Sequence, residues 1–212
     1  MQTKVEKNGT VAIIGAGPAG IYAAKILANA GVQVALINRD IRPGGLAEYG
    51  IYHDKYKMKS GLRKQFKKVL AHPNIHYFGN ITVSTEHPFK LEMLHQIGFD
   101  AVLVTVGAQG TKWLDMEGES LTGVYHAKEL VYHYNSLPSF SEQDYKIGKR
   151  IAIVGVGNVM VDIARWAIRD LHVDEVIAIA RRGAADVKFT KKEMQSVAKN
   201  LDFQALDTEM DR

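Results

Sequence analysis

The strongest constraint on the fold is a pattern that the chain repeats: a short apolar run, closely spaced glycines, and then a segment with helical periodicity. The first copy spans residues 11–29 and the second spans residues 150–171. A further apolar run follows each copy, at residues 32–37 and 176–180. This order predicts a βαβ unit with two neighbouring parallel strands. We therefore expect an α/β protein with two Rossmann-like units in series.

The first glycine segment matches the dinucleotide-binding fingerprint G-x-G-x-x-G, placed between the expected strand and helix. In this fingerprint Gly15 allows the tight turn, Gly17 lets the backbone approach a diphosphate, and Gly20 lets the helix pack closely on the strand. Pro18 and Ala19 open the helix, whose free amides and positive dipole favour phosphate. The segment is predicted to bind a nucleotide; the alternative is a plain glycine turn in an α/β protein.

The end of the following apolar run departs from this fingerprint. The position usually carries Asp or Glu, which holds a ribose hydroxyl. Here it is Asn38, followed by Arg39 and Asp40. An amide can still hydrogen-bond a ribose hydroxyl, although without the help of a charge. We therefore keep Asn38 and Arg39 as expected contacts of an adenine nucleotide.

The second glycine segment keeps the first two glycines, Gly155 and Gly157. It places Met160 where a third glycine or alanine is common. The residues that open the expected helix, Asn158 and Val159, are predicted contacts of the ligand.

Two arginines, Arg181 and Arg182, end the second unit's last apolar run, where an acidic residue would select NAD. A guanidinium group binds phosphate through two hydrogen bonds, which suits the 2′-phosphate of NADP. The pair therefore predicts an NADP-specific site. The alternative is a pair of arginines that faces solvent.

The composition excludes several kinds of redox site. The chain has 212 residues and no cysteine, so it can hold no disulfide, thiolate-bound cluster or redox-active cysteine pair. Any electron carrier must then be a bound organic cofactor or a partner protein, and we expect no metal site. No stretch is apolar enough to span a membrane, and the first residues lack the apolar core of a signal peptide. We expect a cytoplasmic protein without a membrane partner.

The net charge is +4, and part of the excess is local. The basic cluster consists of Lys55, Lys57, Lys59, Arg63, Lys64, Lys67 and Lys68. One interpretation is a solvated helix face, and another is a docking patch for an acidic protein. The cluster lacks interleaved aromatic residues, so we do not expect nucleic-acid binding.

Further motifs accompany the two fingerprints in a fixed order. They are residues 43–46 with 49–51, residues 105–108 with 123–130, residues 155–159 with 162–165, and residues 181–183 with Phe189, Thr190 and Glu193. Together they resemble the two-dinucleotide-binding-domain flavoproteins, and within them the adrenodoxin reductase-like ferredoxin–NADP reductases. The small subunit of glutamate synthase is also similar around residues 43–51, but that family has iron–sulfur cysteines upstream of its first fingerprint.

This resemblance implies FAD at the first site and NADP(H) at the second. Hydride would pass from NADPH to FAD, and single electrons would pass on to a ferredoxin or a similar acidic one-electron carrier. The resemblance adds Gly45, Leu46, Gly107, Ala108 and Glu193 to the expected cofactor contacts.

The chain departs from the family pattern near the flavin. The family usually has a His where Asp54 and Lys55 stand, and His53 lies just before them. It usually has a second Glu at the place of Ser196. No catalytic acid or base can be carried over. His53 is a weak candidate, and the favoured alternative is an ordinary histidine in a surface loop.

The chain also resembles only about the first half of such an enzyme, which suggests either a fragment or a shortened relative. We expect residues 1–110 to form the N-terminal part of an FAD-binding domain, residues 111–149 a connector, and residues 150–212 a truncated NADP-binding domain. A fragment would leave sheet edges uncovered and could require the missing C-terminal half as a partner. The alternative function is therefore a non-catalytic nucleotide-binding fragment or interaction module.

The secondary structure outside the motifs is less strongly patterned. Residues 60–71 are predicted to form a basic amphipathic helix, and residues 127–135 and 191–200 two further helices. We expect short strands within residues 79–98 and one near Phe203.

Overall fold

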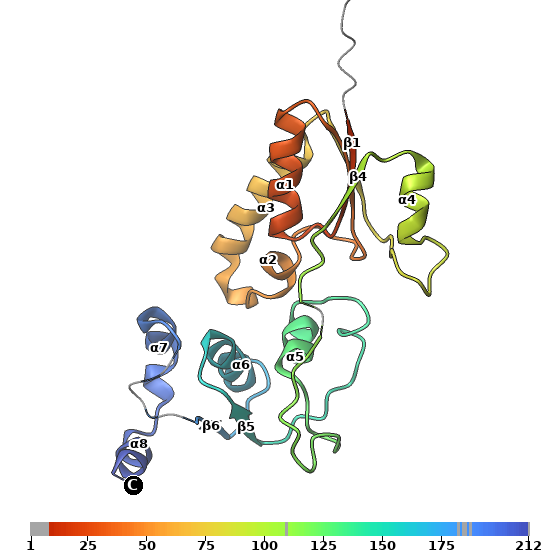
Figure 1. Ribbon diagram of the computed structural model, residues 1–212. Helices are drawn as coiled ribbons and strands as arrows, with labels where there is room; N and C mark the ends of the chain where they lie inside the picture. Colours follow the sequence, from red (N-terminus) through yellow and green to blue (C-terminus); the bar gives the residue numbers. More distant parts are fainter. Residues whose placement is uncertain (1–8, 109, 182, 184–185, 187, 212) are drawn as a thin grey trace, which may run out of the picture. The chain divides into compact units, whose positions relative to one another are not determined.

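Figure 1 shows the computed structural model, which describes residues 9–211 except 109, 182, 184–185 and 187. The chain divides into two compact units, which we describe separately. Unit 1 comprises Met1–Thr111 with Tyr134–Leu137, and unit 2 comprises Lys112–His133 with Pro138–Arg212. Within the described residues, no helix has the length and apolar character needed to cross a membrane.

The centre of unit 1 is a parallel sheet with the strand order β3-β2-β1-β4. Its strands are β1 (Thr10–Ile14), β2 (Gln33–Ile37), β3 (Ile75–Phe78) and β4 (Ala101–Val104). Ile14 at the end of β1 lies opposite Ile37 on one side and Val104 on the other. The three strands therefore end at the same edge, and the turns that follow them meet there.

Helices cover both faces of this sheet (Figure 1). They are α1 (Pro18–Asn29), α2 (Leu46–Tyr49), the short 3₁₀ helix η1 (His53–Lys55), α3 (Tyr56–Leu70) and α4 (Leu91–Ile97). Ile21 of α1 and Phe66 of α3 belong to the core on one face. On the other face, Leu94 of α4 packs with Ala12 and Ile37. This arrangement follows from the alternation of side chains along each strand.

Unit 2 contains a smaller parallel sheet of β5 (Arg150–Val154) and β6 (Glu175–Ile179). Helix α6 (Asn158–Arg169) connects the two strands and buries Val161, Ile163 and Trp166. Further helices in the described part of unit 2 are α5 (Ala127–Tyr134), whose last residue is counted with unit 1, α7 (Lys191–Val197), the 3₁₀ helix η3 (Ala198–Asn200) and α8 (Phe203–Met210). The predicted α/β class with parallel βαβ units is confirmed.

Two expectations about secondary structure are wrong. Among residues 79–98 the structure has helix α4 and no strand, and Phe203 begins helix α8. Leu94 gives α4 a buried anchor. In α8, the Asp202 carboxylate accepts a hydrogen bond of 3.0 Å from the backbone amide of Ala205. An N-cap of this kind is a local helix signal that the apolar pattern does not contain.

Candidate functional site

The first glycine elbow, residues 15–20, lies at the edge of the unit 1 sheet where β1 ends and α1 begins. Gly15 has a φ of 104°, in the left-handed region that favours glycine. A Cβ on Gly20 would lie 2.0 Å from the Gly15 carbonyl oxygen and 2.7 Å from Oγ1 of Thr105. The turn therefore requires glycine at both positions.

Thr105, directly after β4, ties the neighbouring strand to this elbow. Its hydroxyl donates to the carbonyl oxygens of Gly15 and Ile14, at 2.8 and 3.1 Å, and its amide donates to Ile14 at 2.8 Å. The exposed residues Gly107 and Ala108 follow along the same chain segment. Sequence reasoning used Thr105 only as part of a family motif. The missed signal was a hydroxyl side chain immediately after a short apolar strand.

The start of α1 gives the elbow the character of an anion site. Gly17 is the N-cap and Pro18 the first helical residue, so the amides of the first turn have no partner within the helix. A Cβ on Gly45 would lie 3.0 Å from the Gly17 Cα, whereas a Cβ on Gly17 would meet no atom within 4 Å. The two glycine backbones lie against each other and leave open space at the helix N-terminus. A diphosphate fits such a cradle.

A charged cluster supports the loop that carries Gly45. Glu48 is 4% exposed, and its carboxylate accepts hydrogen bonds of 2.7 and 2.5 Å from Nε and Nη2 of Arg63. Burial alone would raise the pKa of Glu48. The hydrogen bond and charge of Arg63, with the charges of Lys59 and Arg42, outweigh burial and lower that pKa below its ordinary value.

Lys59 does not belong to a solvated helix face, because it is 7% exposed. Its Nζ donates to Oδ1 of Asn135 at 2.7 Å, and Nδ2 of Asn135 donates to the Tyr49 carbonyl oxygen at 2.9 Å. Burial lowers the pKa of Lys59, and the nearby Glu48 carboxylate opposes that shift. Lys59 is thus a buried, structural member of the basic cluster, and Arg63 is held by Glu48 although its side chain is 54% exposed. Lys64, Lys67 and Lys68 are exposed.

The remaining predicted residues of unit 1 differ in exposure. Asn38 follows β2 and is 7% exposed, whereas the Arg39 side chain is 55% exposed and pairs with Asp40 at 3.4 Å. Leu46, the first residue of α2, is 64% exposed. His53 is exposed at the start of η1, and its ring lies 4.3 Å from the Tyr52 ring, centroid to centroid. A catalytic role for His53 stays a prediction.

The second glycine elbow, residues 155–160, occupies the equivalent edge of the unit 2 sheet. The Gly155 amide donates to the carbonyl oxygen at the end of β6 at 2.9 Å, and Gly157 is the N-cap of α6. Val159 is 49% exposed beside it. Arg181 is exposed after β6, and the predicted contact Arg182 lies outside the described residues.

Two further predicted contacts of unit 2 are brought together by Thr190. Oδ1 of Asn158 accepts a hydrogen bond of 3.0 Å from the Thr190 amide. The Thr190 hydroxyl in turn accepts from the Glu193 amide at 3.4 Å and caps α7. The motif of residues 189–193 therefore lies beside the start of α6, next to the second elbow.

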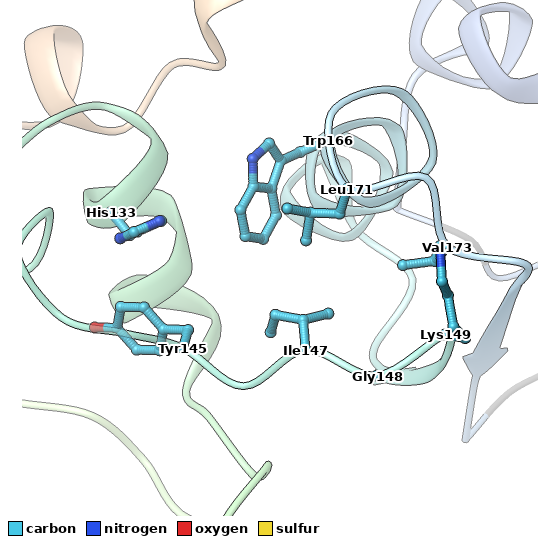
Figure 2. Close-up of a pocket in the computed structure, with 8 residues that line it drawn as sticks. All are labelled: His133, Tyr145, Ile147, Gly148, Lys149, Trp166, Leu171 and Val173. Atoms are coloured by element: carbon cyan, nitrogen blue, oxygen red, sulfur yellow. The ribbon is translucent and has the colours of Figure 1, made fainter.

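A pocket of about 330 Å³ in unit 2 contains none of the predicted contacts. Figure 2 shows His133, Tyr145 and Trp166 around it, with Ile147 and Leu171. Burial raises the pKa of the Tyr145 hydroxyl. Part of the pocket lining comes just before β5 and β6 in the sequence. The pocket therefore lies toward the end of these strands that is opposite the second elbow.

Comparisons with known proteins agree with the predicted resemblance. A sequence model of the family described as pyridine nucleotide-disulphide oxidoreductase matches residues 9–202. NADPH-ferredoxin reductase FprA of Mycobacterium leprae is 32% identical over 95% of this chain and 48% of its own length. Mitochondrial NADPH:adrenodoxin oxidoreductase of Arabidopsis thaliana is 32% identical over 94% of this chain and 46% of its own length.

A solved structure agrees as well. Mycobacterium tuberculosis FprA in complex with NADPH superimposes with a TM-score of 0.81 and 29% identity, covering 92% of this chain and 48% of FprA. The chain thus spans about half the length of the relatives it matches. The predicted resemblance to ferredoxin–NADP reductases of the adrenodoxin reductase type is confirmed.

Proposed function

The chain belongs to the pyridine nucleotide-disulphide oxidoreductase family, and from this premise we propose that it is the nucleotide-binding part of an FAD-dependent NADPH oxidoreductase. The first elbow holds FAD and the second holds NADP(H). The observation that carries the proposal is the pair of elbows, each placing a helix N-terminus at the edge of a parallel sheet. A flavin supplies the ability to take two electrons from a nicotinamide and release them singly.

The residues of unit 1 have defined tasks in this proposal. The cradle formed by Gly17 and Gly45 receives the diphosphate of FAD, because the helix N-terminus supplies amide donors there. Thr105 and Gly20 fix the turn that presents those donors. Gly107 and Ala108 extend the site beyond the end of β4.

In unit 2, Gly157 admits the diphosphate of NADP(H), and Arg181 with Arg182 binds the 2′-phosphate. Replacing both arginines by alanine should weaken NADPH binding by about 1–3 kcal/mol for each charged hydrogen bond lost, with little effect on NADH. Titration of both nucleotides measures this, with exposed Lys192→Ala as control. Equal losses for NADPH and NADH would refute the 2′-phosphate assignment.

The electron acceptor in this proposal is a ferredoxin or another acidic one-electron carrier. The names of the relatives FprA and NADPH:adrenodoxin oxidoreductase support a carrier protein of this class. The exposed lysines of α3 offer an oppositely charged surface in unit 1.

A second candidate function is nucleotide binding without turnover. It is favoured by the exposed apolar side chains of the strands, such as Val104 (57%), Val154 (63%) and Ile179 (48%). Such residues suit a partner polypeptide that supplies the remaining length of the relatives.

Absorbance of the purified chain separates the two functions. The oxidoreductase gives a yellow protein, or one that takes up added FAD, and NADPH bleaches the flavin band faster than NADH does. Retention of FAD without bleaching by NADPH supports the second function. A colourless protein that cannot take up FAD contradicts the first.

A further inference from the structure

Asn38 directly follows β2, at the position that usually carries a ribose-binding carboxylate, yet its side chain is turned to the protein. Its Oδ1 accepts a hydrogen bond of 3.0 Å from the backbone amide of Ala16. Its Nδ2 lies 2.8 and 3.3 Å from the carbonyl oxygens of Asp40 and Arg42, and 3.4 Å from the Tyr77 hydroxyl. The amide thus accepts on one side and donates on the other.

These contacts connect the first elbow to the loop that follows β2. Ala16 lies between the first two glycines of the elbow, and its carbonyl oxygen accepts from the Gly44 amide at 2.7 Å. Its peptide groups are therefore held on one side by the Asn38 side chain and on the other by the loop that carries the cradle. The backbone of Asn38 is also fixed, since its amide donates to Phe78 at 2.8 Å and its carbonyl accepts from Ile81 at 3.0 Å.

We propose that Asn38 is a positioning residue that fixes the first elbow for its ligand, and that this position requires an amide rather than the ribose-binding carboxylate of the fingerprint. The inference rests on the proposed function only in taking FAD as the ligand. Recognition of the ribose then falls to groups other than Asn38.

A carboxylate cannot replace this amide, because it has no hydrogen to donate. It could accept from Ala16, but it would face two carbonyl oxygens in a site that is 7% exposed. The charged or titratable groups around the position are Tyr77 from β3, Tyr49 from α2, and Arg39, Asp40 and Arg42 from the loop.

Most of these surroundings disfavour a negative charge. Burial, the two carbonyl oxygens and Asp40 all oppose ionisation, while the Arg42 side chain is 66% exposed and lies 3.5 Å from Glu48. An Asp at this position would have a raised pKa. Once protonated, it would regain a donor and resemble the amide.

Asn38→Asp should therefore depend on pH in an unusual way. At pH 7.5 the variant should bind FAD about tenfold or more weakly than the wild type, because a buried donor is lost and a charge faces carbonyl oxygens. As the pH falls to 5, the ratio of the two dissociation constants should approach one, since the carboxyl group becomes protonated. If Asn38 instead contacts the ribose, the opposite is expected. Asn38→Asp should then bind FAD as tightly as the wild type or more tightly at pH 7.5, and should lose affinity relative to the wild type as the pH falls.

The test titrates FAD by fluorescence quenching at pH 5–7.5, and it measures the unfolding temperature and Ala16 amide exchange of both proteins without FAD. At pH 7.5 we expect Asn38→Asp to have a lower unfolding temperature than the wild type and faster exchange of the Ala16 amide. Both differences should disappear at pH 5. Asn38→Ser, whose side chain is neutral and smaller, should lose less FAD affinity than Asn38→Asp does at pH 7.5, and this loss should not depend on pH. It replaces Asn38→Asp as the test variant if Asn38→Asp does not fold.

Tighter FAD binding by Asn38→Asp at pH 7.5, with unchanged Ala16 exchange, would overturn the inference. The inference would also be overturned if the Ala16 amide exchanged at the wild-type rate in Asn38→Ser. If the wild type takes up no FAD, the proposed function fails, while the unfolding and exchange measurements still decide the role of Asn38.

Discussion

The two glycine elbows share a sequence pattern but differ in what surrounds them. In the first, a Cβ on Gly20 would meet Gly15 and Thr105 at less than 3 Å. In the second, a Cβ on Gly155 or Gly157 would meet no atom within 4 Å, and Met160 stands at the third position. The fingerprint therefore sets the turn, whereas neighbouring structure sets how tightly it closes.

The sheets behind the two elbows also differ in how far their apolar side chains are buried. In unit 1, Ile13 of β1 and Leu36 of β2 are fully buried. In unit 2, Val154 of β5 and Ile179 of β6 are 63% and 48% exposed. The strands β1 and β2 thus anchor the first elbow with fully buried side chains, whereas the strands behind the second elbow end in exposed apolar residues. We expect a substitution at Gly20 of the first elbow to affect folding, and one at Gly157 of the second to affect ligand binding alone.

The largest expected effect is that of Gly20→Ala. The new methyl group would collide with the Gly15 carbonyl, so α1 must move away from β1, and the free energy of unfolding should fall by at least about 2 kcal/mol. Denaturant unfolding of the FAD-free protein measures this. Gly17→Ala is the matched control, since its methyl group meets nothing: it should change stability by no more than about 0.5 kcal/mol. Equal destabilisation by both substitutions would contradict the close-approach argument.

Glu48→Gln tests the charged cluster that supports the first elbow. Loss of the paired charge should lower the free energy of unfolding by about 1–3 kcal/mol at pH 7. The folded-state pKa of Glu48 lies below 4.5, so its stabilisation is present above that pH and is lost as the pH falls through the folded value. The difference between wild type and variant should therefore shrink below pH 4.5. A difference that persists under acid would assign the effect to packing.

The elements that determine the elbows could be predicted from sequence, because apolar runs, glycines and helix periodicity are local signals. The parallel pairing of the two strands within each βαβ unit followed from the same signals, whereas the places of β3 and β4 in the unit 1 sheet were not predicted. The partners of Asn38 and Lys59 could not be predicted, since they come from segments distant in sequence, such as Ala16 and Asn135. Burial of a lysine on a basic amphipathic helix is a tertiary effect that composition does not contain. Helix α4 was missed because its buried anchor is a single residue, Leu94.

Gly157→Ala addresses the second elbow in isolation. Its Cβ would lie in open space, so the unfolding free energy should stay within about 0.5 kcal/mol of the wild type. In the complex the same methyl group would meet the diphosphate, and NADPH binding should weaken about tenfold, or about 1.4 kcal/mol. Calorimetric titration with NADPH measures this, with FAD uptake as the internal control. Unchanged NADPH affinity would place the diphosphate elsewhere.

The smallest effect is expected for the exposed lysines of α3, which belong to the unit that holds the first elbow. Changing Lys64, Lys67 and Lys68 to Glu should slow electron transfer to an acidic ferredoxin about threefold at low salt and negligibly at 0.5 M salt, because exposed charges act by screened attraction. The matched control changes the exposed Lys191, Lys192 and Lys199 of unit 2 to Glu. Slowing confined to the α3 variant locates the docking surface on unit 1. Equal slowing by both would mean that net charge alone steers the carrier, and no slowing at low salt would leave the α3 lysines as a solvated face.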